Sequence, residues 1–403
     1  MPPSATTRPP ADLTADLEAV VRHLASFERA SASEGERRAA DWIAQRLREE
    51  GCTPRIDQER AHGTYWWPLG LLCAAAGIGA LTGRRAAMAA LGALAAAGIA
   101  DDVSGGPQWF RRRFLPSRAT WNVVAETGDP AGERTVVLVA HHDAAHWSLL
   151  FAPHVSEFIG DRWPALLEKT DTTPPVMFPV IGGPLLVALA GLTGLRSLRR
   201  AGAVVSLGAA ATFAEIGSRS TVPGANDNLS GVATLIGVAR RLREAPVEGL
   251  RVLLVSTGSE ESFMEGMQGF ARRHFASLPV DRTHVVCIDT VGSPELIQLE
   301  GEGMLWMREY PAAFKDLVDR CAASAGVRLR RGLRFRNATD GLIALRRGYP
   351  TVMLGSVNRY KLPDNYHWPT DTAGNVDYST VTDAVTLCEA VVRRLAAPAA
   401  TAA

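Results

Sequence analysis

The stretch that decides the fold is TVVLVAHHD, residues 135–143. Its first six residues are a nearly continuous apolar run, which is typical of a central strand covered on both faces. Two more runs of this kind lie at 250–256 and 284–288. Each run leads into polar groups. The first ends at His141, a glutamate pair at 260–261 follows the second, and Asp289 follows the third. The sequence therefore places reactive side chains at the ends of buried strands.

Helical patterns alternate with these strands. They cover residues 231–244, 263–275, 311–325 and 377–396, and two amphipathic helices are expected between Leu13 and Glu50, the second opened by Ser33. Alternating stretches at 55–59 and 121–126 predict two further strands. Strands that alternate with helices predict an α/β fold, a three-layer α/β/α sandwich around a central mixed, mostly parallel sheet. Open sheets of this class bind ligands beyond the carboxyl ends of their strands.

The composition is that of a folded enzyme. With 403 residues the chain is long enough for one large α/β domain or two smaller ones. A formal net charge of +1, without a basic stripe interleaved with aromatic residues, gives no sign of a nucleic-acid partner. The five cysteines are scattered and lack CxxC spacing, so we expect buried free thiols. The Pro-rich N-terminal tail has no apolar core, so no cleavable signal peptide is expected.

A second informative stretch is PGANDNLSG, residues 223–231. Its Asp227 lies in a Gly/Asn-rich turn before an apolar-periodic segment, where a loop enters a helix and both carboxylate oxygens are free to bind a cation. Taken alone, this pattern is more often a simple helix cap. Two histidines and several carboxylates without cysteine, however, are a ligand set typical of a hydrolytic dinuclear zinc site.

Five motifs occur in a fixed order between about Asn122 and Thr372. They are AHHDA at 140–144, PGANDNLSG at 223–231, GSEES at 258–262, CIDTVG at 287–292 and YHWPTDT at 366–372. In this order they resemble metallopeptidase family twenty-eight, the co-catalytic zinc exopeptidases that include aminopeptidases, glutamate carboxypeptidases and glutaminyl cyclases. Any single motif would be weak, whereas five in the right order make the resemblance strong.

The resemblance implies a role for each ligand-type residue. His141 and Asp289 would hold one zinc ion, Glu261 and His367 would hold a second, and Asp227 would bridge both. A bridging carboxylate supplies the negative charge that two dications about 3.5–4 Å apart require. The pair of ions would lower the pKa of a shared water and stabilise the oxyanion of the tetrahedral intermediate.

The same resemblance implies catalytic and substrate-binding residues. Glu260 would be the general base that takes a proton from the water and delivers it to the leaving amine. Asp143 would orient His141, because a histidine ligand normally gives its other ring N–H to a carboxylate. The substrate-binding residues would be Tyr366, Trp368 and Asp340, the last in a segment that looks like the family's Ser-Asp pair.

Some of these assignments have alternatives. His142 could bind the metal in place of His141. It stands four residues before His146, and two histidines at this spacing on a helix can bind one metal ion. The glutamate pair at 260–261 alone would most often be a solvated helix start. Trp368 is either a wall of the substrate cleft or a core residue.

The function expected from the resemblance is a zinc-dependent exopeptidase, foremost an aminopeptidase with peptide substrates and two zinc ions per chain. One alternative is a glutaminyl cyclase-like aminoacyltransferase that uses a single zinc, and another is a catalytically silent membrane receptor or scaffold. The complete ligand set, notably Asp289, favours hydrolysis. The sequence does not determine the preferred side chain or the oligomeric state.

Two apolar insertions interrupt the peptidase pattern. We divide the chain into five segments. Residues 1–65 hold the N-terminal helices and the first strand of the peptidase domain, which continues at 121–146 and 221–397. The two insertions are a hydrophobic hairpin at 66–100 and a segment with a second hairpin at 147–220. The first hairpin joins 66–82 to 86–100 around Arg84-Arg85. The second joins 175–195 to 201–214 around Arg196, Arg199 and Arg200.

We expect both hairpins to lie in a membrane, with lipid as a partner and the cell membrane as the location. Segment 175–195 is long enough to cross the bilayer core, whereas the other three are at or below the lower limit. A buried helical cap over the active site of a cytoplasmic enzyme is the alternative. The positive-inside tendency would place the arginine-bearing turns in the cytoplasm and the catalytic domain outside. Three arginines at 111–113 flank the domain side, so sidedness stays open.

Overall fold

The apolar runs form the centre of a seven-stranded sheet in the structure, a computed structural model that describes residues 11–397. Across the sheet the strands are β1 (Thr53–Ala61), β2 (Arg118–Gly128), β4 (Leu250–Thr257), β3 (Arg134–His141), β5 (Thr283–Ile288), β10 (Thr351–Val357) and β6 (Glu295–Gln298). Strands β4, β3, β5 and β10 are parallel, whereas the pairs β1–β2, β2–β4 and β10–β6 are antiparallel. The predicted mixed, mostly parallel sheet is confirmed.

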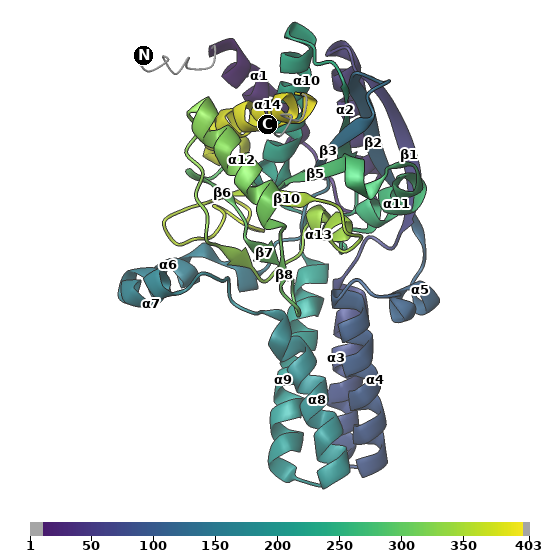
Figure 1. The fold of residues 1–403 in the computed structure, drawn as a ribbon. Helices are drawn as coiled ribbons and strands as arrows, with labels where there is room; N and C mark the ends of the chain where they lie inside the picture. Colours follow the sequence, from purple (N-terminus) through teal and green to yellow (C-terminus); the bar gives the residue numbers. More distant parts are fainter. Residues whose placement is uncertain (1–10, 398–403) are drawn as a thin grey trace.

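Helices cover both faces of this sheet (Figure 1). Val136 and Leu138 of β3 pack against one helical layer and Val137 and Val139 against the other, because successive side chains of a strand point to opposite faces. The first layer consists of α1 (Ala11–Leu24), α2 (Glu34–Glu49), α10 (Ser230–Glu244), α12 (Ala312–Ala325) and α14 (Tyr378–Ala396). The second contains α11 (Glu265–His274) and α13 (Asp340–Leu345). The three-layer sandwich predicted from the sequence is therefore present.

The predicted helices begin and end close to their expected residues. Ser33 caps α2 by accepting a hydrogen bond from the Glu36 amide at 3.2 Å. The five cysteines are buried and free, as expected. The sequence patterns did not predict several short elements, namely α5 (Trp109–Phe114), α6 (Pro153–Arg162), α7 (Pro164–Lys169), β7 (Gly301–Glu302), β8 (Arg308–Glu309) and β9 (Arg334–Phe335). The expectation about the N-terminal tail concerns residues 1–10, which lie outside the described residues.

The two apolar insertions fold together into a four-helix stalk that projects from the sandwich (Figure 1). Its helices are α3 (Trp66–Thr82), α4 (Arg85–Val103), α8 (Met177–Thr193) and α9 (Arg196–Ser218). Small residues allow close contact between α4 and α8, since a Cβ atom at Gly92 would lie 2.5 Å from the Ala188 amide nitrogen. The stalk projects away from the sandwich and does not close over it as a buried cap would.

One helix of the stalk is longer than the predicted apolar segment. Helix α9 begins at Arg196 rather than near residue 201, so Arg199 and Arg200 lie in its first turn and not in the connecting loop. The preceding helix ends at Gly194, whose φ of 78° is a left-handed conformation that favours glycine and stops a helix. Leu195 is then the residue before α9, which leaves a very short connection at the tip of the stalk.

Candidate metal centre

The five predicted ligand side chains come together at one edge of the sheet. His141 is the last residue of β3, Asp289 directly follows β5, and Glu261 follows β4 after a short turn. These strands are parallel, so their carboxyl ends meet at the same edge. Asp227 reaches this edge from the segment before α10, and His367 reaches it from the loop after β10.

The turn that carries Asp227 is fixed from two sides. Gly224 has a φ of 61°, a left-handed conformation that glycine adopts readily, and it turns the chain into the segment Ala225–Leu229. The Asp371 carboxylate accepts hydrogen bonds from the amides of Asn226 and Asp227, at 2.6 and 3.1 Å. The Asp227 side chain is thereby held at the edge of the sheet and is 3 % exposed.

Asp227 lies between two groups of candidate ligands. Its Oδ1 is 3.1 Å from His141 Nε2, and its Oδ2 is 3.2 Å from His367 Nε2. His367 Nε2 is also 3.3 Å from Glu261 Oε2, while His141 Nε2 is 3.8 Å from Asp289 Oδ2. Ligand atoms of His141, Asp227 and Asp289 lie within 4.8 Å of one another, as do those of Asp227, Glu261 and His367. The two groups share Asp227.

The cluster carries more negative charge than its own histidines offset. Burial raises the pKa of Asp289 well above its usual range, and the neighbouring carboxylates raise it further while His141 opposes them. The pKa of Glu260 is raised in the same way. Burial would lower the pKa of His367, but Glu261 and Asp227 raise it to about 10. A divalent cation would supply the missing positive charge.

The donor set therefore fits a metal ion on two observations from the described residues. The ligand atoms are imidazole nitrogens and carboxylate oxygens, which suit zinc and related divalent ions. In addition, Glu261 Oε1 is buried without a hydrogen-bond partner. An unpaired carboxylate oxygen at that depth is costly unless a cation binds it.

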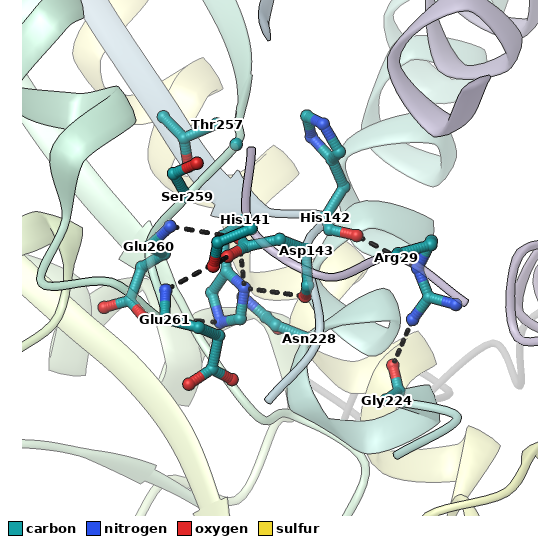
Figure 2. Close-up of polar contacts among 12 residues, drawn as sticks. Arg29, His141, His142, Asp143, Gly224, Asn228, Thr257, Ser259, Glu260 and Glu261 are labelled. Carbon is teal, nitrogen blue, oxygen red and sulfur yellow. Dashed lines mark hydrogen bonds and ion pairs between the residues drawn. The ribbon is translucent and has the colours of Figure 1, made fainter. Parts of the chain in front are cut away.

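Asp143 contacts more than the histidine that it was predicted to orient. Its Oδ1 lies 3.4 Å from His141 Nδ1. The same carboxylate accepts hydrogen bonds from the amides of Glu260 and Glu261, at 3.0 and 3.1 Å, and from the Ser31 hydroxyl at 2.6 Å. Figure 2 shows the carboxylate between the imidazole and the two glutamate amides. Asp143 thus fixes a ligand from β3 and the glutamate pair after β4 at once.

Two buried charged residues hold the backbone segments that carry the candidate ligands, and the sequence patterns did not reveal them. Glu36 accepts hydrogen bonds from the amide and the hydroxyl of Ser259, both at 2.9 Å, just before the glutamate pair. The Arg29 guanidinium donates to the backbone oxygens of His142 and Gly224, at 3.0 and 3.3 Å (Figure 2). Arg29 therefore joins the turn after β3 to the turn before Asp227.

The structure places His141, and not His142, in the cluster. His142 points away from it, into the packing between the sheet and the first helical layer, where its Nδ1 lies 2.9 Å from the Ser256 hydroxyl. Burial lowers its pKa to about 3, so its imidazole is neutral. His146 does not join it in a ligand pair, because its ring packs at 4.4 Å from the ring of Trp66.

The predicted substrate-binding residues occupy different positions. Tyr366 lines the cavity and its ring stacks on His367 at 4.0 Å. Phe151, from the second insertion, meets both rings edge-on, a contact that the sequence did not reveal. Trp368 does not line the cavity and packs instead against Trp147, with ring centroids 5.8 Å apart. Its role in substrate binding stays a prediction.

Asp340 lies next to the cavity and not in its lining. Asp340 is 1 % exposed, accepts a hydrogen bond from the Thr257 hydroxyl and lies behind the wall of the cavity. The neighbouring residues of that segment, Asn337, Ala338 and Thr339, line the cavity in its place. The role of Asp340 in substrate binding stays a prediction.

A small cavity lies above the cluster. Its walls are formed by the candidate ligands, Glu260, Thr290, Phe335, Asn337, Ala338, Thr339, Met353, Pro363 and Tyr366. In the described part of the chain, no lysine or arginine contributes to this lining. The cavity is therefore acidic and small, with apolar walls on one side.

Comparisons with known proteins agree with this geometry. Residues 212–392 match the model of a family described as Peptidase family M28. Among curated proteins, no sequence matches the chain. An aminopeptidase from Aneurinibacillus sp. strain AM-1 has a similar structure, with a TM-score of 0.56, 13% identity and coverage of 96% of this chain and 94% of the other.

Two further solved structures have the same fold. A glutaminyl cyclase from Bacteroides thetaiotaomicron bound to N-acetylhistamine has a TM-score of 0.54, 13% identity and coverage of 94% and 97%. A Zn-dependent exopeptidase from Parabacteroides distasonis ATCC 8503 has the same TM-score, identity and coverage. At these identities the likeness shows the fold, and it includes proteins of different activity.

Proposed function

We propose that the chain, whose residues 212–392 match the model of Peptidase family M28, is a zinc-dependent exopeptidase that acts as an aminopeptidase on N-terminal peptide bonds. The observation that carries the proposal is the position of Asp227, whose two oxygens face different histidines at 3.1 and 3.2 Å. His141 and Asp289 would hold one ion, and Glu261 and His367 would hold a second. Zinc, when bound, supplies a Lewis acid for the scissile carbonyl and lowers the pKa of a coordinated water.

Glu260 is the residue proposed as general base. It lines the cavity, and its Oε2 lies 4.0 Å from His141 Nε2, at the border of the ligand cluster. Its amide is fixed by Asp143, so the side chain is presented to the cavity from a rigid backbone. In this role Glu260 takes a proton from the attacking water and gives it to the leaving amine.

The described lining of the cavity provides no permanently cationic side chain for a substrate carboxylate. An exopeptidase that removes C-terminal residues needs a cationic side chain for the terminal carboxylate. The described lining offers no lysine or arginine for such a carboxylate, which favours an aminopeptidase over a carboxypeptidase.

A panel of substrates tests this proposal against its alternatives. The detergent-solubilised, zinc-loaded chain is incubated with aminoacyl amides, with N-acylated dipeptides and with peptides that begin with glutamine. We expect release of the N-terminal residue from the first group and no reaction of the second. Cyclisation of N-terminal glutamine without hydrolysis would support the cyclase alternative, and inactivity on every substrate would support a silent receptor or scaffold.

We further propose that the stalk holds the enzyme in a membrane. Charged residues are absent from its apolar stretches, 66–83, 86–100, 175–195 and 201–214, and occur only at the two ends. At 1.5 Å per residue these stretches are roughly 20–30 Å long, close to the hydrocarbon thickness of a bilayer. Large apolar side chains face outward along the stalk, among them Leu81 at 68 % and Val204 at 72 % exposure. In water this surface would be an aggregation liability.

The two longest stalk helices support this placement. Helices α4 and α9 are long and apolar enough to cross a bilayer. Only 44% and 22% of their most apolar 18-residue stretches are buried in the molecule. At the end next to the sandwich, Trp67 and Trp109 are 55 % and 40 % exposed, where a membrane interface favours tryptophan. The tip carries Arg84, Arg85 and the arginines of α9. We propose that the tip lies in the cytoplasm and the sandwich outside, the orientation that the positive-inside tendency favours for the arginines of the tip.

Cell fractionation and protease access test the location. We expect the full-length chain in the membrane fraction, extracted by detergent and not by high salt. External protease should reach the sandwich in intact cells if the sidedness is correct. Recovery in the soluble fraction without detergent would support a cytoplasmic enzyme, and protection of the sandwich in intact cells would reverse the orientation.

A further inference from the structure

A buried arginine joins the stalk to the loop that carries the glutamate pair. Arg111 belongs to α5, which directly follows the stalk helix α4, and its side chain is 0 % exposed. It makes a bidentate contact with Asp102 at the end of α4, at 2.8 Å for both bonds. Its remaining terminal nitrogen donates to the Ser262 backbone oxygen at 2.7 Å. Ser262 is the residue after Glu261, the proposed ligand.

A second contact extends this link to the start of α11. Arg111 lies 3.4 Å from the Glu265 carboxylate, which also accepts a hydrogen bond from the Ser262 hydroxyl at 2.7 Å. His62 and Gly63, just before the first stalk helix, donate their amides to the same carboxylate at 2.8 and 3.1 Å. The segments that enter and leave the first hairpin therefore meet at the glutamate loop.

The loop between these contacts has a backbone that needs support. Phe263 and Met264 have φ values of 72° and 54°, a left-handed conformation that residues other than glycine rarely adopt. Such conformations persist when surrounding contacts hold them in place. The Phe263 ring lies between Tyr65, at the start of the first hairpin, and the Arg111 guanidinium, at 5.2 and 5.4 Å.

We propose that Arg111 is a positioning residue for Glu260 and Glu261, and that docking of the stalk through Arg111 gives the glutamate loop its active geometry. The proposal rests on the proposed function for the roles of the two glutamates. Asp143 fixes their amides from the side of β3, while Arg111 fixes the following residues from the side of the stalk. Residues 259–264 lie outside both β4 and α11, and Glu36 at Ser259 and Gln268 at Phe263 hold the two ends of this segment. Arg111 is the anchor from the stalk side next to Glu261.

The test compares Arg111→Gln and Arg111→Lys with a matched control. Lysine keeps the charge but cannot reproduce a bidentate contact together with a third directed bond. The control is Arg251→Gln, which removes a bidentate contact with Glu126 at 2.9 and 2.8 Å between β4 and β2. That pair lies at the opposite end of β4 from the glutamate loop.

Two readouts are measured on the detergent-solubilised full-length chain. Hydrogen exchange of the metal-free protein follows the amides of residues 260–265, which are hydrogen-bonded at 260, 261, 264 and 265. We expect faster exchange there in Arg111→Gln and an intermediate effect in Arg111→Lys. Steady-state kinetics of the zinc-loaded protein should show kcat lowered about 10–100-fold with KM little changed, the range typical of residues that orient ligands. Arg251→Gln should change neither readout.

One pattern would overturn the proposal. If Arg111→Gln accelerates exchange only in α4 and α5, and residues 260–265 and kcat stay at their original values, Arg111 merely attaches the stalk. Should the unaltered chain show no hydrolysis at all, the proposed function fails, while the exchange of residues 260–265 still decides whether Arg111 holds the loop.

Discussion

Replacement of Asp143 by asparagine tests how the glutamate pair is positioned. The Asp143 carboxylate is 0 % exposed, and its two oxygens accept the amides of Glu260 and Glu261 at 3.0 and 3.1 Å. Asparagine has the same shape but only one acceptor oxygen. In Asp143→Asn, one glutamate amide must therefore face an NH₂ group instead of an oxygen.

The magnitude follows from the bonds that are lost. A hydrogen bond to a charged group contributes about 1.5–3 kcal/mol, so we expect the free energy of unfolding to fall by roughly that amount. Residues that orient metal ligands commonly affect activity or metal affinity about 10–100-fold, and we expect a loss in this range. Asp129→Asn is the matched control, because Asp129 also accepts two backbone amides, those of Ala131 and Gly249, both at 2.9 Å.

The assay measures urea unfolding of the metal-free chain and kcat of the zinc-loaded chain for both variants. Asp129→Asn should lose stability with little change in kcat, since it lies at the far end of the sheet. If Asp143→Asn retained the original kcat while losing stability, the carboxylate would be a structural brace and our reasoning about the glutamate pair would be wrong.

Three further predictions concern individual carboxylates. Glu260→Gln keeps the shape of the side chain but removes the proton acceptor, so turnover should fall by about two to four orders of magnitude while metal analysis finds zinc retained; near-normal turnover would refute the assignment of the base. Asp227→Ala removes the charge shared by both groups of ligands, so zinc content should fall to trace levels after dialysis; full zinc content would contradict the bridging role. For Glu265, burial would raise the pKa, but the charge of Arg111 and the hydrogen bonds from His62 lower it from 4.5 to about 2. A lowered pKa stabilises the fold above the unfolded value near 4.5, and this stability is lost as the pH falls towards 2, by roughly 3 kcal/mol. The difference in unfolding free energy between the unaltered chain and Glu265→Gln should shrink accordingly from pH 5 to pH 2, and a pH-independent difference would show that the carboxylate is not held as an ion.

The sequence predicted the ligand-type residues well because they occur in motifs at strand ends. An apolar run followed by His141 or Asp289 marks both a buried strand and the edge where its reactive side chain emerges. Topology then brings these ends together, since parallel neighbours present their carboxyl ends at one edge. The resemblance favoured His141 over His142 because Asp143 then takes the orienting position. In the structure His141 ends β3 and lies in the cluster, whereas the next residue, His142, points away from it.

The supporting residues were not predictable in the same way. Arg29 and Glu36 lie in ordinary charged stretches and Arg111 in a run of three arginines, and only tertiary packing distinguishes these buried residues from their neighbours. Helix α9 began earlier than its apolar segment because hydropathy does not mark a first turn rich in arginine. Spacing along the chain located the segment of Asp340 beside the cavity but could not specify which of its residues form the lining.

The zinc content of the reconstituted chain tests the central claim most directly. Metal-depleted, detergent-solubilised protein is titrated with zinc, and bound metal and hydrolysis of an aminoacyl amide are measured on the same samples. Two groups of ligands that share Asp227 predict about two zinc ions per chain, with hydrolysis rising as the sites fill. Zinc that stays at trace levels after reconstitution would contradict the account.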